Sequence, residues 1–212
     1  LIILSHVLEH LYDAQVVVSL LPLLSRGGFL YLETPDAARY DTDSFPPLYF
    51  FDPEHINHFS AESLKYLGAT LGLMPRVAGH KSLTLANGSR YPAIFSLFQP
   101  GDVPSAPPTL AGGLYPPLLA YVERSMADMD SLRSRLLALV GENRPFALWG
   151  AGSLSQRLVG TSWFPRKSLL AIVDRDHNKQ GLAFAGHIIA NPESGLRGLP
   201  DATLVLCAAL LL

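Results

Sequence analysis

Cysteine, net charge and long apolar runs are all scarce in this chain of 212 residues. The one cysteine, Cys207, cannot form an internal disulfide, and no CxxC or Cys/His ligand spacing exists, so neither a disulfide scaffold nor a structural zinc site is expected. Sixteen basic and eighteen acidic residues give a formal charge of −2, which excludes the strongly basic surface that nucleic acid or an anionic membrane requires. No apolar run reaches the roughly 18 residues of a membrane span, and the first residues lack the charged region ahead of an apolar stretch that is typical of a signal peptide. These absences favour a cytoplasmic protein with a small-molecule substrate.

Apolar residues are plentiful, at 49% of the chain against 16% charged residues. This composition can fill one large core or two smaller ones. The sequence starts inside a strand-like run, LIIL, and ends on ATLVLCAALLL, which indicates a strand with no turn after it. We therefore interpret the sequence as a fragment, truncated at both ends, with one or two folded units.

The first 34 residues predict a βαβ unit. An apolar strand at 1–4 precedes a helical pattern that extends to about residue 25, with Asp13 as N-cap and Pro22 as a kink. A Gly-Gly turn then leads to a buried strand at 29–34. Such a unit implies a parallel sheet with a right-handed crossover.

The next segment predicts a long loop, a helix and a hairpin. Residues 36–59 lack a clean period but are rich in aromatics, which favours a functional loop over disorder. Ser60 caps a helix that ends near Gly72. Residues 74–85 and 91–98 can pair as a β-hairpin across Asn87-Gly88.

A stretch dense in proline and glycine, QPGDVPSAPPTLAGG, predicts a linker between two domains. We place the domains at 1–98 and 115–212, with the linker at 99–114. The second domain opens with a long helix whose mainly apolar stripe, expected to pack in the core, lies at positions 118, 122, 125 (a serine), 129, 132, 136 and 139. A second βαβ unit follows, with strands at 145–149 and 169–173, and a last strand at 203–207.

Polar residues follow the first strand directly, in the sequence SHVLEH. In an open parallel sheet ligands bind outside the carboxyl ends of the strands, which places Ser5 and His6 at the ligand edge, with Glu9 and His10 one turn further on. Two histidines four residues apart can in principle bind a metal ion. With one nearby carboxylate and no HExxH pattern, we expect no metal site.

The combination of SHVLEHL, a helix, a Gly-Gly turn and GFLYLETP resembles the fourth and fifth strands of class I AdoMet-dependent methyltransferases, over roughly residues 1–98. The resemblance implies an α/β fold, the C-terminal part of that family's Rossmann-like sheet. It also implies S-adenosyl-L-methionine (AdoMet) as cofactor, with Ser5, His6 and Val7 contacting it. The glycine-rich motif and the acidic residue that bind most of the cofactor in that family would lie before Leu1.

The dipeptide Glu54-His55 is the strongest candidate for acid–base chemistry. An adjacent carboxylate raises the pKa of an imidazole toward and above neutrality, which suits a general base. The alternative is an ordinary solvated pair in a loop. The aromatic residues around the pair favour a pocket with apolar walls, built from Tyr49, Phe50, Phe51 and Phe59.

The segment YFFDPEH before a serine-capped helix is similar to a loop of nucleotide-sugar C-methyltransferases. The resemblance implies that Glu54, His55 and His10 are catalytic. His55 would be the base that forms an enolate, whose carbon then takes the AdoMet methyl group. Asp52 stands where that family has a tyrosine, and Tyr49 lies three residues earlier, so both are candidate substrate contacts. Methylation of a hydroxyl oxygen remains the open alternative.

The turn in WGAGSLSQ is a candidate phosphate site. Gly150 and Gly152 permit a tight strand-to-helix turn, and the following helix N-terminus attracts anions. Asp174, 22 residues after Gly152, fits the ribose-binding acid of a Rossmann unit, but Ser155 replaces the third glycine of the fingerprint. A purely structural turn explains the glycines equally well.

The stretch from WGAG through DRDHNKQG to GHII resembles the C-terminal Rossmann-like domain of the same sugar methyltransferases. That domain would help to hold a nucleotide sugar. The implied substrate contacts are Gly150, Ala151, Gly152, Ser153, Asp174, Lys179 and His187. Two other functions stay open: a nucleotide- or sugar-binding module without activity, and an NAD-dependent oxidoreductase, which only the glycine turn and Asp174 suggest.

Overall fold

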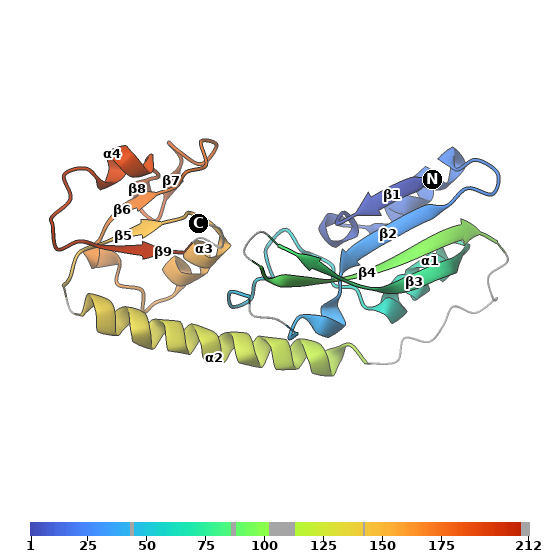
Figure 1. Ribbon diagram of the computed structural model, residues 1–212, viewed down its shortest axis with the longest axis horizontal. Coiled ribbons are helices and arrows are strands. Elements are labelled where there is room, and N and C mark those ends of the chain that lie inside the picture. The colour runs from blue at the N-terminus through green and yellow to red at the C-terminus, as the bar shows by residue number, and fades with distance from the viewer. Residues whose placement is uncertain (43–44, 86–87, 102–112, 142, 209–212) are drawn as a thin grey trace. The chain divides into compact units, whose positions relative to one another are not determined.

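The computed structural model describes residues 1–42, 45–85, 88–101, 113–141 and 143–208 (Figure 1). The chain divides into two compact units, Leu1–Glu123 and Arg124–Leu212. The division falls inside the long helix α2 (Tyr115–Val140), whereas the sequence predicted a linker at 99–114. Most of that linker, 102–112, lies outside the described residues. None of the described helices is long and apolar enough to cross a membrane.

The N-terminal unit is built on a four-stranded mixed sheet in the order β1-β2-β4-β3. The strands are β1 (Ile2–Ser5), β2 (Leu30–Pro35), β3 (Leu73–Thr84) and β4 (Arg90–Pro100). The predicted parallel pairing of the first two strands is confirmed, since β1 and β2 are parallel neighbours. The predicted hairpin is also present, and its strand β4 joins β2 antiparallel, which makes the sheet mixed. Asn87 of its predicted turn lies outside the described residues.

The predicted α-helix between β1 and β2 is wrong in type. The chain instead forms two 3₁₀ segments, η1 (Leu8–His10) and η2 (Ala14–Leu23). The N-cap is confirmed, since the Asp13 side chain accepts a hydrogen bond of 2.8 Å from the Gln15 N–H. Three consecutive valines and Pro22 explain the difference, because β-branched side chains crowd an α-helix and proline lacks the N–H that would continue it.

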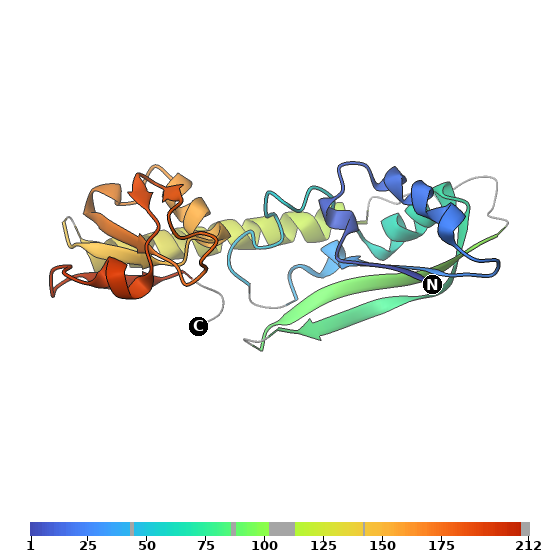
Figure 2. The same cartoon turned by 90° about the horizontal axis from the view of Figure 1, so that it is seen from above.

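Helix α1 (Ala61–Thr70) covers one face of this sheet, the same face as the 3₁₀ segments (Figure 2). It begins as predicted at Ser60, whose side chain accepts from the Ser63 N–H while the Ser63 hydroxyl accepts from the Ser60 N–H. Gly68 lets the helix approach β4 closely, because a Cβ there would lie 2.2 Å from the Phe98 ring. The loop before α1 contains η3 (Ala37–Arg39) and is otherwise irregular, as expected.

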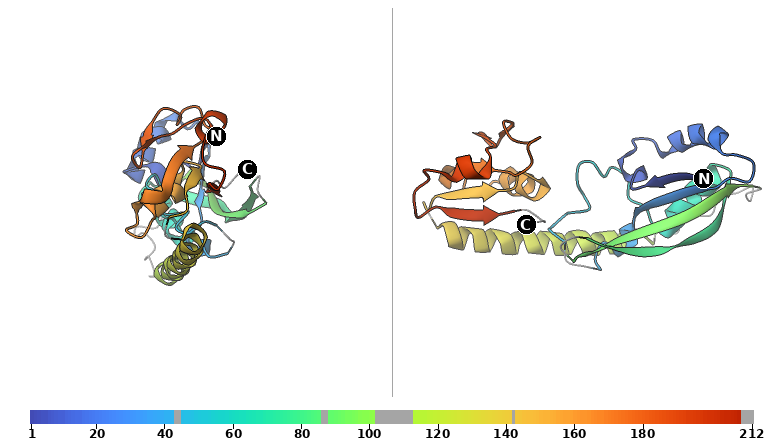
Figure 3. Two further views of the ribbon diagram at one scale, coloured as in Figure 1. Left: turned by 90° about the vertical axis from the view of Figure 1, so that its left-hand side faces the viewer. Right: turned by 45° about the horizontal axis from the view of Figure 1, so that its top comes forward.

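The C-terminal unit has a three-stranded parallel sheet in the order β6-β5-β9, along which the second half of α2 runs (Figure 3). The elements are β5 (Phe146–Trp149), α3 (Ser153–Gly160), η4 (Arg166–Ser168), β6 (Leu169–Val173), β7 (Ala183–Phe184), β8 (His187–Ile188), α4 (Pro192–Leu196) and β9 (Leu204–Cys207). The predicted strands are therefore present.

The apolar stripe predicted for α2 is correct in part. Met129 and Leu136 are buried, but Leu139 is 53% exposed and Val140 takes the core position instead. The buried face of α2 is therefore rotated slightly from the predicted one. An α-helix has 3.6 residues per turn, so positions spaced alternately by three and four residues drift gradually around the helix.

Candidate functional site

The loop that carries Glu54 and His55 is tied to the turn that follows β1. The backbone N–H groups of Ile56 and Asn57 both donate to the Glu9 carbonyl, at 2.9 and 3.1 Å. The Asn57 side chain adds two more hydrogen bonds, to the carbonyls of Leu8 and Leu11. Residues almost fifty positions apart are thereby held together at the carboxyl end of β1, the edge at which ligands bind in open α/β sheets.

These hydrogen bonds of Ile56 and Asn57, called the clamp below, bring two predicted catalytic residues, His10 and His55, into contact. Their ring centroids lie 4.9 Å apart in an edge-to-face arrangement. His10 Nδ1 lies 2.9 Å from the Glu54 carbonyl, and His55 Nδ1 lies 3.3 Å from the Phe50 carbonyl. A carbonyl oxygen can only accept, so each Nδ1 carries a hydrogen, and in the neutral ring each Nε2 keeps its lone pair. Both rings therefore present a basic nitrogen.

Glu54 contributes its backbone to the site. Its side chain is exposed, and among the described residues its carboxylate makes neither a hydrogen bond nor an ion pair, although its carbonyl orients His10. The tuning of His55 by the Glu54 carboxylate, which the dipeptide suggested, therefore has no contact in this structure that supports it.

The carboxylate that lies beside both histidines is Glu9, which is 1% exposed. One oxygen of Glu9 and one nitrogen from each of His10 and His55 lie within 4.8 Å of one another. Glu9 Oε1 is 3.1 Å from His6 Nδ1, while Oε2 is buried and has no hydrogen-bond partner in the described part of the chain. Sequence patterns missed this role, since a glutamate on a short turn is usually solvated.

The predicted cofactor residues Ser5, His6 and Val7 stand at the carboxyl end of β1, next to this site. The Ser5 hydroxyl donates to Glu33 Oε1 at 3.1 Å, and the His6 N–H donates to the Glu33 carbonyl at 2.9 Å. His6 has a φ of +53°, a conformation that costs a non-glycine residue energy and is frequent at functional sites. Its buried Nε2 lacks a hydrogen-bond partner among the described residues, although Glu33 Oε1 is 3.5 Å away.

Glu33 is the centre of a charged network that the sequence did not predict. Lys81 and Tyr31 both hydrogen-bond its carboxylate, and Lys81 also contacts the Tyr31 hydroxyl. Burial alone would raise the pKa of Glu33, but these hydrogen bonds hold it below its usual value. Strand alternation places Tyr31 and Glu33 on one face, whereas nothing in the sequence indicates a partner from β3.

Most of the predicted aromatic walls belong to a core. Phe50 is fully buried and stacks on Tyr40 with the ring centroids 4.1 Å apart, and the Phe50 N–H donates to the Tyr121 hydroxyl at 3.1 Å. Tyr49 is only partly buried, and burial raises the pKa of its phenol, with a further contribution from Asp52. Tyr49 therefore remains a hydrogen-bond donor at neutral pH.

An open hollow of about 490 Å³ adjoins the histidine pair. It is lined by His10, Pro53, Glu54 and Ile56, and it falls in the size range of small-molecule sites. His58, on the other side of the loop, contacts the Tyr40 hydroxyl at 3.0 Å. Burial lowers the pKa of His58, and the nearby His55 lowers it further, so His58 stays neutral and structural.

At the second predicted site, the glycine turn of the C-terminal unit, the Asp174 carboxylate is hydrogen-bonded to neighbouring groups of the chain. Asp174 Oδ2 accepts from the Ala151 N–H at 2.8 Å and from Lys179 at 3.3 Å, while Oδ1 accepts from the Asp176 N–H at 2.9 Å. Burial would raise the pKa of Asp174, but these donors hold it below its usual value. Both oxygens that the Rossmann pattern assigns to a ribose are thus already bonded.

The remaining predicted substrate contacts in this unit lie in the turn after β5 and on β8, and none of them is fully exposed. Gly150 has a φ of +104°, which only glycine adopts easily, whereas Gly152 has an ordinary φ of −96° with open space around its Cα. Ser153 begins α3, and His187 lies on β8 with its side chain partly exposed. The requirement for glycine at position 150 is therefore a property of the turn itself.

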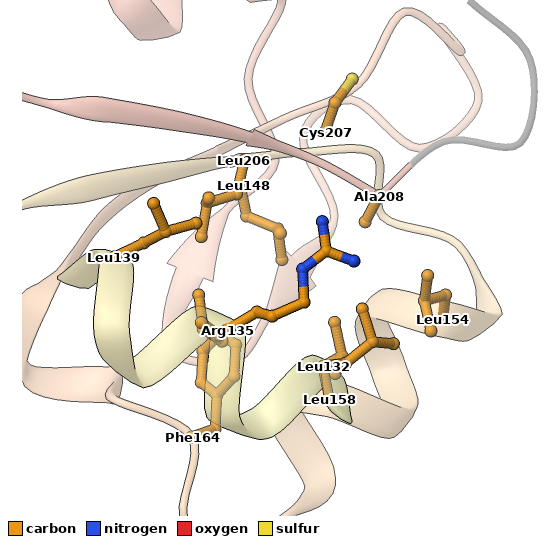
Figure 4. Close-up of a pocket in the computed structure, with 11 residues that line it drawn as sticks. Leu132, Arg135, Leu139, Leu148, Leu154, Leu158, Phe164, Leu206, Cys207 and Ala208 are labelled. Atoms are coloured by element: carbon orange, nitrogen blue, oxygen red, sulfur yellow. The ribbon is translucent and has the colours of Figure 1, made fainter. Parts of the chain in front are cut away.

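The same unit contains an apolar pocket of about 250 Å³ between α2, α3 and the ends of β5 and β9 (Figure 4). Its lining is apolar apart from Cys207 and Arg135, and the Arg135 guanidinium lies among the apolar side chains of the lining. The pocket can hold an apolar group, but its lining offers no pair of acid and base.

Comparison with protein-family models and with curated proteins yields no match to this chain. The assignment of a function therefore depends on the geometry of the two units.

Proposed function

We propose that this protein is an AdoMet-dependent methyltransferase that methylates a carbon of a nucleotide-linked sugar or a related small molecule, with His55 as general base. One observation carries the proposal: His10 and His55 meet at the carboxyl edge of the sheet, each with Nδ1 bound to a carbonyl and Nε2 unbonded in the described structure. A base needs such a lone pair within reach of substrate.

The sheet agrees with this proposal. The resemblance to class I methyltransferases requires the strands that end in SHVLEH and LYLETP to be parallel neighbours, and β1 and β2 pair in parallel from Ile2 to Ser5. AdoMet would bind against Ser5, His6 and Val7. The buried His6 Nε2, which lacks a hydrogen-bond partner among the described residues, fits a polar group of a ligand on that wall.

The proposed reaction transfers one proton and one methyl group. His55 Nε2 takes a proton from the substrate carbon next to a carbonyl, which leaves an enolate. AdoMet bound against Ser5, His6 and Val7 would supply the electrophilic methyl group for that carbon and would leave as S-adenosyl-L-homocysteine. The proton passes from His55 to solvent after transfer. A carbon acid requires a base more strictly than a hydroxyl does, which is why the paired histidines favour carbon as the acceptor.

We assign the anionic partner of the histidines to Glu9 in place of Glu54. Glu9 is buried beside both rings, so its charge would stabilise the imidazolium that forms when His55 takes the proton. Glu54 instead acts through its carbonyl, which fixes the orientation of His10.

The experiment that tests the proposal is His55→Ala in the full-length protein, assayed for methyl transfer from AdoMet to nucleotide-linked keto sugars. We expect a loss of about two to four orders of magnitude. His177→Ala is the matched control, because His177 is exposed and hydrogen-bonds Gln180 in the C-terminal unit. Product analysis separates methylation on carbon from methylation on oxygen. Unchanged activity of His55→Ala would rule out its role as base.

A further inference from the structure

Glu9, His10 and His55 have the composition of a metal site. One ligand atom from each lies within 4.8 Å of the other two. Glu9 Oε2 is buried and has no hydrogen-bond partner in the described part of the chain. A buried carboxylate oxygen without a partner carries a high desolvation cost, and a bound cation is one of the few ways to offset it.

The surroundings of the three side chains are those that metal ligands usually have. Ligating histidines bind the ion through one nitrogen and donate from the other to a carbonyl or carboxylate. His10 and His55 both have Nδ1 on a backbone carbonyl, which leaves Nε2 for an ion. Glu9 is held in the same manner, because His6 Nδ1 contacts its Oε1 at 3.1 Å.

The geometry requires a small contraction. Ligands around a tetrahedral zinc ion lie about 3.4 Å apart, as follows from bond lengths of about 2.0–2.1 Å. The three ligand atoms, which lie within 4.8 Å of one another, would close to this value by small side-chain rotations, and His10 is exposed and has space to tilt about its hydrogen bond to the Glu54 carbonyl. The hollow lined by His10, Pro53, Glu54 and Ile56 gives an ion access from solvent.

We infer that Glu9, His10 and His55 bind a divalent transition-metal ion of the Zn²⁺ type, with a fourth position open to water or to an oxygen of the substrate. Two imidazoles and a carboxylate suit such ions better than Mg²⁺ or Ca²⁺, which prefer oxygen ligands. The sequence did not suggest this site because the chain supplies its third ligand 45 residues after His10.

The inference goes beyond the proposed function and adds a consequence to it. An ion on His55 Nε2 would occupy the lone pair that takes the proton, so the metal-bound protein could not use His55 as a base. Metal binding and proton abstraction would exclude each other, and Zn²⁺ would inhibit methyl transfer.

Calorimetric titration of Zn²⁺ into the chelator-treated full chain tests this site. We expect His10→Ala, His55→Ala and Glu9→Gln each to weaken binding by more than about 100-fold, since losing even a residue that only orients a ligand costs about 10–100-fold. His177→Ala should bind as the unaltered chain does. Because Glu9→Gln changes a buried group, Co²⁺ provides a second measurement: its intense four-coordinate visible spectrum should vanish in His55→Ala.

Equal Zn²⁺ affinity in the unaltered chain and all three ligand variants would overturn the inference, as would a six-coordinate Co²⁺ spectrum in the unaltered chain. The outcomes for the two proposals are separable. Zn²⁺ binding without any methyl transfer contradicts only the proposed function, and methyl transfer that is insensitive to Zn²⁺ contradicts only the metal site.

Discussion

The loop of the N-terminal unit and the glycine turn of the C-terminal unit were both predicted to bind substrate, yet they differ in the atoms that they leave unbonded. In the loop, Glu9 Oε2 is without a hydrogen-bond partner among the described residues, and the rings of His10 and His55 use only Nδ1. In the turn, both oxygens of Asp174 accept hydrogen bonds from the chain itself. The polar atoms of a binding motif can therefore be bonded within the chain itself, and polar atoms that stay unbonded distinguish a site from a structural turn.

After the loss expected for His55→Ala itself, the largest effect should come from removing the side chain that ties the loop to the turn after β1. Asn57→Ala removes the side-chain hydrogen bonds to the carbonyls of Leu8 and Leu11, so His55 loses its fixed distance from His10. We expect methyl transfer to fall about 100-fold, because a displacement of about 1 Å at a reacting group costs that much. Asn178→Ala, at an exposed position of the C-terminal unit, is the control. Full activity of Asn57→Ala would show that the clamp is not needed to position His55.

A smaller effect, on stability, is expected at the turn. Asp174→Asn weakens the bonds to the Ala151 N–H and to Lys179, so the free energy of unfolding of the C-terminal unit should fall by about 1.5–3 kcal/mol. Trp149 and Trp163, the two tryptophans of the chain, both lie in this unit and report its unfolding by fluorescence.

The pH dependence of this difference in unfolding free energy between the unaltered chain and Asp174→Asn tests its cause. The folded pKa of Asp174 lies below its usual value of 3.8, so the stabilisation is present above that pH and is lost as the pH falls through the folded pKa. The unaltered chain and Asp174→Asn should therefore converge in acid. A difference in stability that persists at low pH would mean that the carboxylate charge is not its cause.

The smallest effect should follow Glu54→Gln. Its carbonyl, which orients His10, is unchanged by the substitution, and its side chain is exposed. We expect methyl transfer to fall less than about tenfold, below the range for loss of a general base. A loss as large as that of His55→Ala would restore the Glu54 carboxylate to the role that the dipeptide suggested.

The fold was predictable where local signals agree with packing. Apolar and alternating runs located β1, β2 and the β3–β4 hairpin, and Ser60 marked the start of α1. An α-helix was predicted between β1 and β2 because the apolar residues there have helical spacing. That spacing was given more weight than the three valines and the proline, which disfavour an α-helix. The 3₁₀ form of this segment depends on that local crowding, which periodicity does not measure.

The site was predictable only in part. His10 and His55 could be named from the sequence, but their contact depends on the Glu9 carbonyl that binds Ile56 and Asn57. The burial of Glu9 and its proximity to both histidine rings result from the tertiary structure, which local sequence patterns do not show. A sequence shows which residues can act as acids and bases, while hydrogen bonds between distant segments decide which of their atoms remain unbonded.

The proposed roles of His10 and His55 depend most directly on which ring nitrogen carries the hydrogen in each neutral side chain. Long-range proton–nitrogen correlation NMR on ¹⁵N-labelled protein above the imidazole pKa distinguishes the two tautomers. The structure predicts that both residues carry hydrogen on Nδ1 and have an unprotonated Nε2, since Nδ1 faces a carbonyl in each. Hydrogen on Nε2 of His55 would contradict its role as base and as metal ligand through that atom.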